Sequence, residues 1–236
     1  MLTMLTQRQK ELLQAIINEY IKTAEPVGSV LLVDKYKLDI SSATVRNEML
    51  ELDAQDFLGQ PHTSSGRIPT ERAYQFFVSE GFKIKKITQN QKDKLAKTIK
   101  NCRGQDKRQG LKDLAKSLAD LSGELILLAF QDNDFYYTGL TNLFSKPEFR
   151  NQEIVCNMST AIDHLDARLA KLFHKVDDQA RIFIGSQNPI DQNLSLITVK
   201  ISQMGPLIAL LGPMRMDYET NAGLLEYSKE LISNFK

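Results

Sequence analysis

The sequence predicts an α+β protein with a helical N-terminal part and a C-terminal part in which strands and helices alternate. Apolar residues recur at helical spacing up to about residue 54, two short apolar segments flank a Ser/Gly turn at 57–69, and strand-like segments follow from residue 124. The chain has 236 residues, which is enough for one large domain or two ordinary ones. We divide the chain into an N-terminal domain at residues 1–80, a basic helical linker at 81–120 and a C-terminal α+β domain at 121–236.

Capping signals and apolar spacing predict three helices in the first 56 residues. Thr6 and Gln9 have the spacing of a capping box, before a helix that ends near Thr23. We expect Ser29 to cap a short second helix. Ser41 or Ser42 caps a third, whose buried face carries three apolar residues and which stops near Asp56, a residue type that tolerates left-handed backbone. These three residues are Val45, Met49 and Leu52.

A hairpin and a further helix complete this first part. Residues 57–61 and 67–69 flank the turn formed by 62–66, as in a hairpin. Thr70 then caps a helix with an apolar face. Helix, short helix, turn, helix and hairpin is the order of a winged helix-turn-helix, a fold whose third helix enters the major groove of DNA.

The third helix presents candidate base-reading residues on the side opposite its apolar face. A helical wheel directs Ala43, Thr44 and Asn47 outward, with Arg46 beside them. Asn pairs with adenine and Arg with guanine, and Ser41, Ser42 and the helix N-terminus suit phosphate. The alternative is an ordinary surface helix with a serine cap.

The hairpin turn offers a second set of DNA contacts. Small hydroxyls suit phosphates, and an Arg at a wing tip can enter the minor groove. His62 contacts phosphate or is simply solvated, and the whole hairpin can also be a plain soluble turn. The candidate wing residues are His62, Thr63, Ser64, Ser65 and Arg67.

Charge is distributed unevenly, although the whole chain has a net charge of only +1. Residues 1–86 have no net charge, residues 87–116 carry +6, and residues 117–236 carry −5. The basic middle indicates either a polyanion nearby or a solvated, lysine-rich linker helix. It is followed by an apolar stripe, which we expect to contribute to a dimer interface. The stripe consists of Leu111, Leu114, Leu118 and Leu121.

The alternating patterns of the C-terminal half predict a sheet covered by helices. We expect strands at 124–130, 135–140, 180–185, 194–202 and 206–211, the last two forming a hairpin, and helices at 161–176 and 220–235. Arg215 and Asp217 either form a buried pair or anchor the loop before the last helix, or else they have a functional role.

Few residues support catalysis, a cofactor or a metal. We predict no enzyme, because no nucleophile with a base and an orienting group is visible. His164 and His174 lie roughly 15 Å apart if ten helical residues separate them, too far for one metal ion. Cys102 and Cys156 are expected to be a linker thiol and a core thiol. No membrane span or signal peptide is apparent, so we expect a cytoplasmic protein.

Several long runs resemble the HrcA family of bacterial heat-inducible transcription repressors. These runs are 25–29, 40–49 and 60–70 in the N-terminal part, and 139–144, 146–149 and 212–218 in the C-terminal part. The resemblance implies a winged-helix N-terminal domain and a GAF-like C-terminal domain. It further implies repression of chaperone operons at an inverted-repeat operator called CIRCE, and modulation by the chaperonin.

The sequence departs from the family pattern in three places. Ser65 replaces an expected Ala in the wing, and Asp56 replaces an expected Gly after the third helix. Between residues 130 and 135 the family carries an inserted module associated with dimerisation, which this chain lacks.

The sequence therefore predicts a DNA-binding transcriptional repressor that acts as a homodimer on double-stranded DNA. A symmetric dimer suits an inverted repeat because it places one recognition helix on each half-site. The main alternative is a winged-helix regulator whose GAF-like domain senses a small-molecule ligand.

Overall fold

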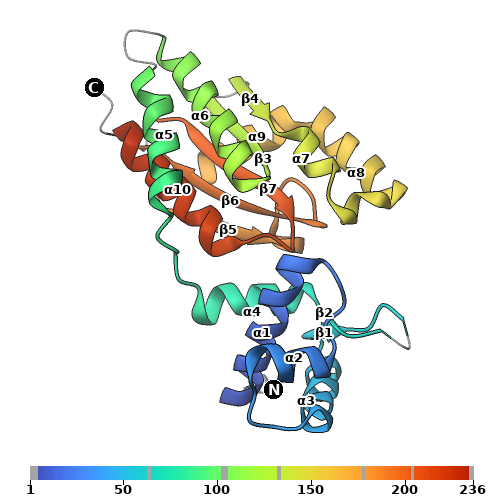
Figure 1. The fold of residues 1–236 in the computed structure, drawn as a ribbon. Coiled ribbons are helices and arrows are strands. Elements are labelled where there is room, and N and C mark those ends of the chain that lie inside the picture. The colour runs from blue at the N-terminus through green and yellow to red at the C-terminus, as the bar shows by residue number, and fades with distance from the viewer. Residues whose placement is uncertain are drawn as a thin grey trace. The chain divides into compact units, whose positions relative to one another are not determined.

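A computed structural model describes residues 5–62, 65–101, 106–131, 134–176, 179–202 and 205–233. The chain forms two compact units, Met1–Phe82 and Lys83–Lys236 (Figure 1). Each unit is built around its own core.

The N-terminal unit has the order of elements expected for a winged helix. Its short strands pair antiparallel, Leu58 opposite Pro69 and Gly59 opposite Ile68, and an isolated bridge joins Val27 to Arg67. The elements are α1 (Gln7–Thr23), α2 (Ser29–Tyr36), α3 (Ser42–Ala54), β1 (Leu58–Gly59), β2 (Ile68–Pro69) and α4 (Glu71–Gly81).

Local hydrogen bonds define where these helices begin. The Thr6 and Gln9 capping box is formed as predicted, and the hydroxyls of Ser41 and Thr70 accept backbone N–H bonds at the starts of α3 and α4. Asp56 has φ 61°, which confirms its left-handed backbone. The expected Ser29 cap is wrong: Gly28 is the N-cap of α2, and no side chain caps this helix.

The C-terminal unit surrounds one five-stranded antiparallel sheet with strand order β4-β3-β7-β6-β5. β6 and β7 pair from Leu194–Pro213 to Lys200–Leu207, which confirms the predicted hairpin. The strands are β3 (Leu125–Gln131), β4 (Asp134–Thr138), β5 (Arg181–Ile184), β6 (Leu194–Lys200) and β7 (Leu207–Pro213). The helices are α5 (Gln89–Asn101), α6 (Lys107–Ser122), α7 (Leu140–Phe144), η1 (Pro147–Arg150), α8 (Gln152–Asp163), α9 (Leu165–Lys175), η2 (Gly185–Gln187) and α10 (Tyr218–Ser233).

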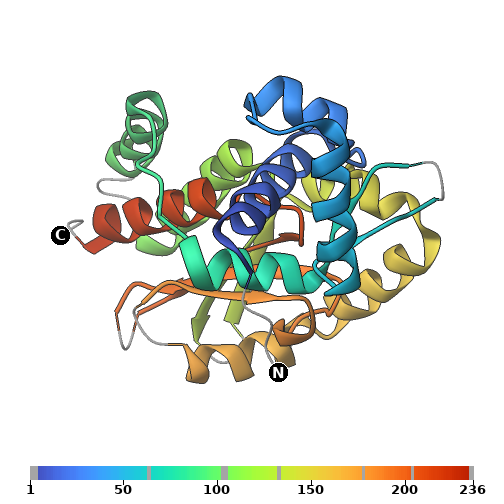
Figure 2. The same ribbon diagram turned by 90° about the horizontal axis from the view of Figure 1, so that it is seen from below.

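Helices cover both faces of this sheet (Figures 1 and 2). Leu125, Leu127 and Ala129 of β3 face one core together with Leu165 and Leu169 of α9. The intervening residues of β3 point to the opposite face, where α6 and α10 pack. β6 and β7 are buried along their whole length because they lie in the middle of this sandwich.

Two predicted features of the middle segment are wrong. The linker expected at residues 81–120 is not separate, because α5 and α6 pack within the C-terminal unit, which begins at Lys83. Leu114 and Leu118 are fully buried in this unit and are not available as a dimer seam. Lysine-rich composition indicates solvent exposure on average, but a thin apolar stripe is enough to fix a helix onto a sheet.

The single helix expected at 161–176 is also wrong. α9 begins only at Leu165, and a separate helix, α8, precedes it and ends at Asp163. Cys156 is exposed on α8 and is not a core thiol, whereas Cys102 lies outside the described residues. Among the described residues, no helix is long and apolar enough to cross a membrane.

Candidate nucleic-acid interface

The outer face of α3 is formed by residues that the sequence singled out. Ala43, Arg46 and Asn47 are exposed, while Val45, Met49 and Leu52 on the other side belong to the core. Glu48, also buried, forms an ion pair with Arg8 of α1, which holds α3 against the domain. Because the helix is fixed on one side only, its exposed side can enter a DNA groove.

The start of α3 is polar and closely hydrogen-bonded. The Ser41 hydroxyl accepts a bond from the Thr44 backbone N–H at 3.1 Å and lies 3.0 Å from the Thr44 hydroxyl. Ser42 and Thr44 are half-buried and Ser41 is exposed. One hydroxyl of the Ser41–Thr44 pair donates to the other, so the second retains a proton that it can donate to a phosphate oxygen.

Ser65 uses its hydroxyl to close the turn of the wing. It donates to the His62 carbonyl at 2.7 Å and accepts from the His62 backbone N–H at 3.1 Å. Its hydroxyl therefore shapes the turn. His62 itself is exposed, and the predicted contacts Thr63 and Ser64 lie outside the described residues.

Arg67 lies at the base of the wing, not at its tip. Its backbone exchanges two hydrogen bonds with Val27, at 2.8 and 2.9 Å. Its side chain is only 12% exposed and its Nε lies 2.8 Å from Asp53 Oδ2 of α3. The arginine thus joins the wing to α3, and the expected insertion of Arg67 into the minor groove is not the arrangement that the structure shows.

Arg67→Ala is expected to destabilise the N-terminal unit by about 1 kcal/mol and to leave the salt dependence of DNA binding unchanged. The guanidinium of Arg67 neutralises Asp53 and not a phosphate. Its removal therefore does not change the number of counterions that the DNA releases when the protein binds. Chemical denaturation and binding titrations at several salt concentrations measure both effects. A slope of log affinity against log salt that falls by about one would instead place Arg67 on the DNA backbone.

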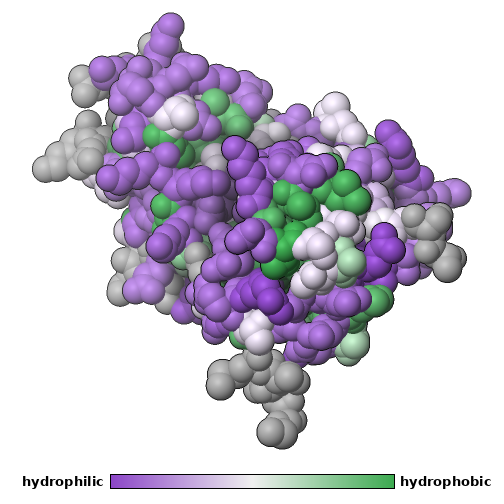
Figure 3. Space-filling view, turned by 60° about the horizontal axis from the view of Figure 1, so that its bottom comes forward, coloured by the Kyte–Doolittle hydropathy of each residue, from purple (hydrophilic) through white to green (hydrophobic). Residues whose placement is uncertain are grey.

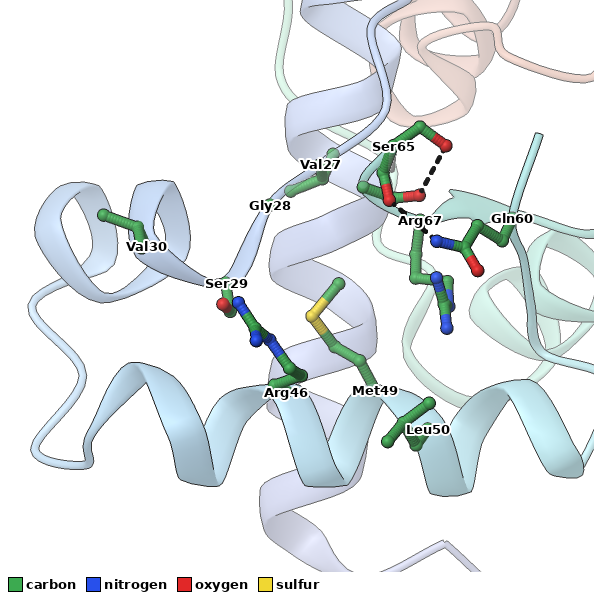
Figure 4. A pocket seen from close by; sticks show the side chains of 11 residues that line it. Val27, Gly28, Ser29, Val30, Arg46, Met49, Leu50, Gln60, Ser65 and Arg67 are labelled. Atoms are coloured by element: carbon green, nitrogen blue, oxygen red, sulfur yellow. Dashed lines mark hydrogen bonds between the residues drawn. The ribbon is translucent and has the colours of Figure 1, made fainter. Parts of the chain in front are cut away.

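A groove of about 450 Å³ lies between α2, α3 and the wing. Figure 4 shows Arg46 and Met49 rising from α3 between α2 on one side and Arg67 on the other. The lining of this groove combines the guanidinium groups of Arg46 and Arg67, the uncapped start of α2 and apolar side chains. The lining residues are Val27, Gly28, Ser29, Val30, Arg46, Met49, Leu50, Gln60, Ser65, Gly66 and Arg67.

Two motifs of the C-terminal unit, 146–149 and 212–218, meet around a buried carboxylate, Glu124. The Lys146 Nζ lies 2.6 Å from Glu124 Oε1. The carboxylate also lies directly against Gly212, where an added Cβ would be only 2.1 Å from Glu124 Oε2. Arg215 pairs with Glu148 at 2.7 Å and not with Asp217, so the expected Arg–Asp pair is wrong. Asp217 instead accepts bonds from Thr220 at the start of α10, which confirms the loop-anchor alternative.

This cluster joins distant segments of the C-terminal unit and makes its stability depend on pH. Burial raises the pKa of Glu124 to about 7, against the opposing influence of Lys146 and Arg215. The folded unit therefore holds a proton that the unfolded chain, with a glutamate pKa near 4.5, has released.

The free energy of unfolding is consequently expected to fall as pH rises from about 4.5 to about 7, by up to about 3 kcal/mol. Glu124→Gln should flatten this profile. Glu148→Gln should flatten it much less, because the charge of Glu148 raises the pKa of Glu124 less than burial does. Denaturant titrations across this pH range measure the profile. An unchanged slope in Glu124→Gln would mean that another group binds the proton.

Both units of the chain match known families. A family model described as "Winged helix-turn-helix transcription repressor, HrcA DNA-binding" matches residues 4–82. A second, "HrcA protein C terminal domain", matches residues 72–221.

Curated relatives are similar over different lengths. A heat-inducible transcription repressor HrcA of Thermodesulfovibrio yellowstonii is 26% identical over 330 aligned residues, covering 92% of this chain and 94% of that protein. The alignment is longer than this chain, so the relative contains residues that this chain lacks. A protein of the same name from Natranaerobius thermophilus is 58% identical over 76 residues, 32% of this chain and 22% of the relative.

A solved structure with the same fold is also found. It is described as the crystal structure of a hypothetical protein at 2.2 Å resolution and has a TM-score of 0.73, with 98% of both chains covered and 16% sequence identity.

Proposed function

Because the chain belongs to the HrcA family of heat-inducible transcription repressors, with a winged-helix DNA-binding domain, we propose that it represses chaperone operons at an inverted-repeat operator of the CIRCE type. The observation that carries this proposal is the exposed face of α3, which presents Arg46 and Asn47 beside the wing. The family comprises transcription repressors and not enzymes.

The proposed contacts divide into base-reading and backbone-binding groups. Asn47 pairs with adenine and Arg46 with guanine, while Ala43 allows the helix to approach the bases closely. Ser41, Ser42, Thr44 and His62 bind the phosphate backbone, where they set the register of the helix without reading sequence. Thr63 and Ser64 are proposed to join them from the wing.

The inverted repeat implies a homodimer on double-stranded DNA. The interface cannot use Leu114 and Leu118, because both are buried within their own unit. Exposed surface of the C-terminal unit, which we propose to be GAF-like, is the remaining candidate. Light scattering of the full chain at micromolar concentration distinguishes a dimer from a monomer.

A footprint on the promoter of the organism's own chaperonin operon tests the operator directly. Protection should cover two symmetric half-sites, and a fragment with one half-site scrambled should bind markedly more weakly. Protection confined to unrelated sequence, or absent at every concentration, would contradict the proposal.

We also propose that the protein acts in the cytoplasm and that the chaperonin maintains its active form. After a heat pulse, added chaperonin should raise the DNA-binding fraction without any small molecule. Recovery that requires a metabolite would favour a ligand-sensing C-terminal unit instead.

A further inference from the structure

Leu50 is an exposed leucine on the same face of α3 as the two proposed base-reading residues. It is 49% exposed, whereas Met49 before it and Leu52 after it are core residues. It follows Arg46 by four residues and Asn47 by three, so all three side chains share one side of the helix. A single exposed leucine is ordinary on a protein surface, but this one continues a row of side chains that faces outward.

Apolar surface is concentrated near this position. Val30, 59% exposed, and Leu31, 43% exposed, lie at the start of α2. Val30 and Leu50 both line the groove that also contains Arg46 (Figure 4). Figure 3, which looks onto the N-terminal unit, shows apolar surface enclosed by polar side chains on that side of the molecule.

The neighbours of Leu50 indicate what covers it. A guanidinium and an amide lie one turn away, and the uncapped start of α2 presents backbone N–H groups on the far side of the groove. These groups suit an anionic, hydrogen-bonding partner with small apolar features. In the major groove of DNA, thymine alone among the four bases presents a methyl group.

We propose that Leu50 is a specificity-determining residue that packs against the C5-methyl group of a thymine in the operator. This inference rests on the proposed DNA-binding function. The rise from Asn47 to Leu50 is about 4.5 Å along the helix, so the thymine lies within one or two base pairs of the base that Asn47 reads. Leu50 thereby adds an apolar contact to the hydrogen bonds of Arg46 and Asn47.

Substitution of single operator thymines by deoxyuridine tests this contact, because it removes only the methyl group. The full chain should lose about fourfold in affinity at one thymine of each half-site, the value expected for one lost methyl contact. Leu50→Ala should bind the unmodified operator more weakly and should no longer distinguish thymine from uracil at that position.

Leu31→Ala is the matched control. It truncates another exposed leucine of the same unit, on α2 and outside the row formed by Arg46, Asn47 and Leu50, so it should keep the full sensitivity to uracil. Circular dichroism confirms that both variants are folded, which is expected because neither side chain belongs to the core.

Three results would overturn the inference. If the parent chain binds equally well with uracil at every position, it makes no contact with a thymine methyl group. If Leu50→Ala loses as much affinity on uracil substitution as the parent chain does, another residue makes the contact. A Leu50→Ala variant with unchanged operator affinity but an altered oligomeric state makes this face a protein interface. If the parent chain shows no sequence preference on any fragment, the proposed function itself fails, which is distinguishable from failure at Leu50 alone.

Discussion

Asn47→Ala is expected to weaken binding to the operator by about 1–3 kcal/mol, which is roughly fivefold to 150-fold, with little change on DNA of unrelated sequence. Asn47 is exposed on α3, and the core of the unit lies on the opposite side of that helix. Its amide can donate to adenine N7 and accept from the N6 amino group, two bonds that alanine cannot replace. Random DNA offers no matching base in register, so little is lost there.

Fluorescence anisotropy titrations on both DNAs at one fixed salt concentration measure the two losses. Glu51→Gln, an exposed position one helical turn further along α3, serves as a control that should keep the specificity of the parent chain. Equal losses on both DNAs for Asn47→Ala would reject a base-reading role and reduce Asn47 to a general contributor to affinity.

Gly66→Ala is expected to displace the wing and to lower operator affinity at least tenfold, although Gly66 need not touch DNA. An added Cβ would lie 2.4 Å from the Val27 carbonyl oxygen and 2.5 Å from its carbonyl carbon. Backbone atoms cannot turn aside as a flexible side chain can, so the Val27–Arg67 bridge must open. Overpacking of this kind costs about 1–3 kcal/mol of stability.

Gly59→Ala is the matched control for this prediction, because it lies in the same hairpin and an added Cβ there meets only the Thr70 Cγ2 methyl at 4.0 Å, an ordinary contact. Denaturant unfolding and operator titrations should separate the two variants clearly. If Gly66→Ala kept both parent stability and parent affinity, the wing would not depend on its bridge to Val27.

Local rules predicted the N-terminal unit well. Helix caps and apolar spacing depend on neighbours within one turn, so Thr6, Ser41 and Asp56 could be assigned from sequence. The outward direction of Ala43 and Asn47, with Arg46 beside them, followed from the same spacing, whereas Thr44, also expected to point outward, is half-buried. Leu50 lies on the same exposed side, but its apolar side chain offers no hydrogen bond that would mark it in the sequence as a base contact.

Contacts between distant residues were not predictable in this way. Arg67 resembled a wing-tip arginine, yet its partner Asp53 lies fourteen residues earlier and meets it only after the hairpin folds back onto α3. Arg215 likewise pairs with Glu148 of η1 and not with its sequence neighbour Asp217. A charged residue whose partner comes from another element leaves no periodic signal in the sequence.

The burial of α5 and α6 has a similar cause. Leu114 and Leu118 lie on a thin apolar stripe, which suits a linker, a dimer seam and a sheet-covering helix equally well. Only the position of the sheet decides between them, and sheet topology depends on strand pairing across the whole unit.

The ratio of affinities for the inverted-repeat operator and for a scrambled fragment of equal length and composition, measured at one physiological salt concentration, tests the central claim most directly. A repressor that reads bases through α3 should bind its operator roughly a thousandfold or more tightly than the scrambled fragment. A ratio near one would contradict the account, because it would leave only non-specific attraction between the protein and the phosphate backbone.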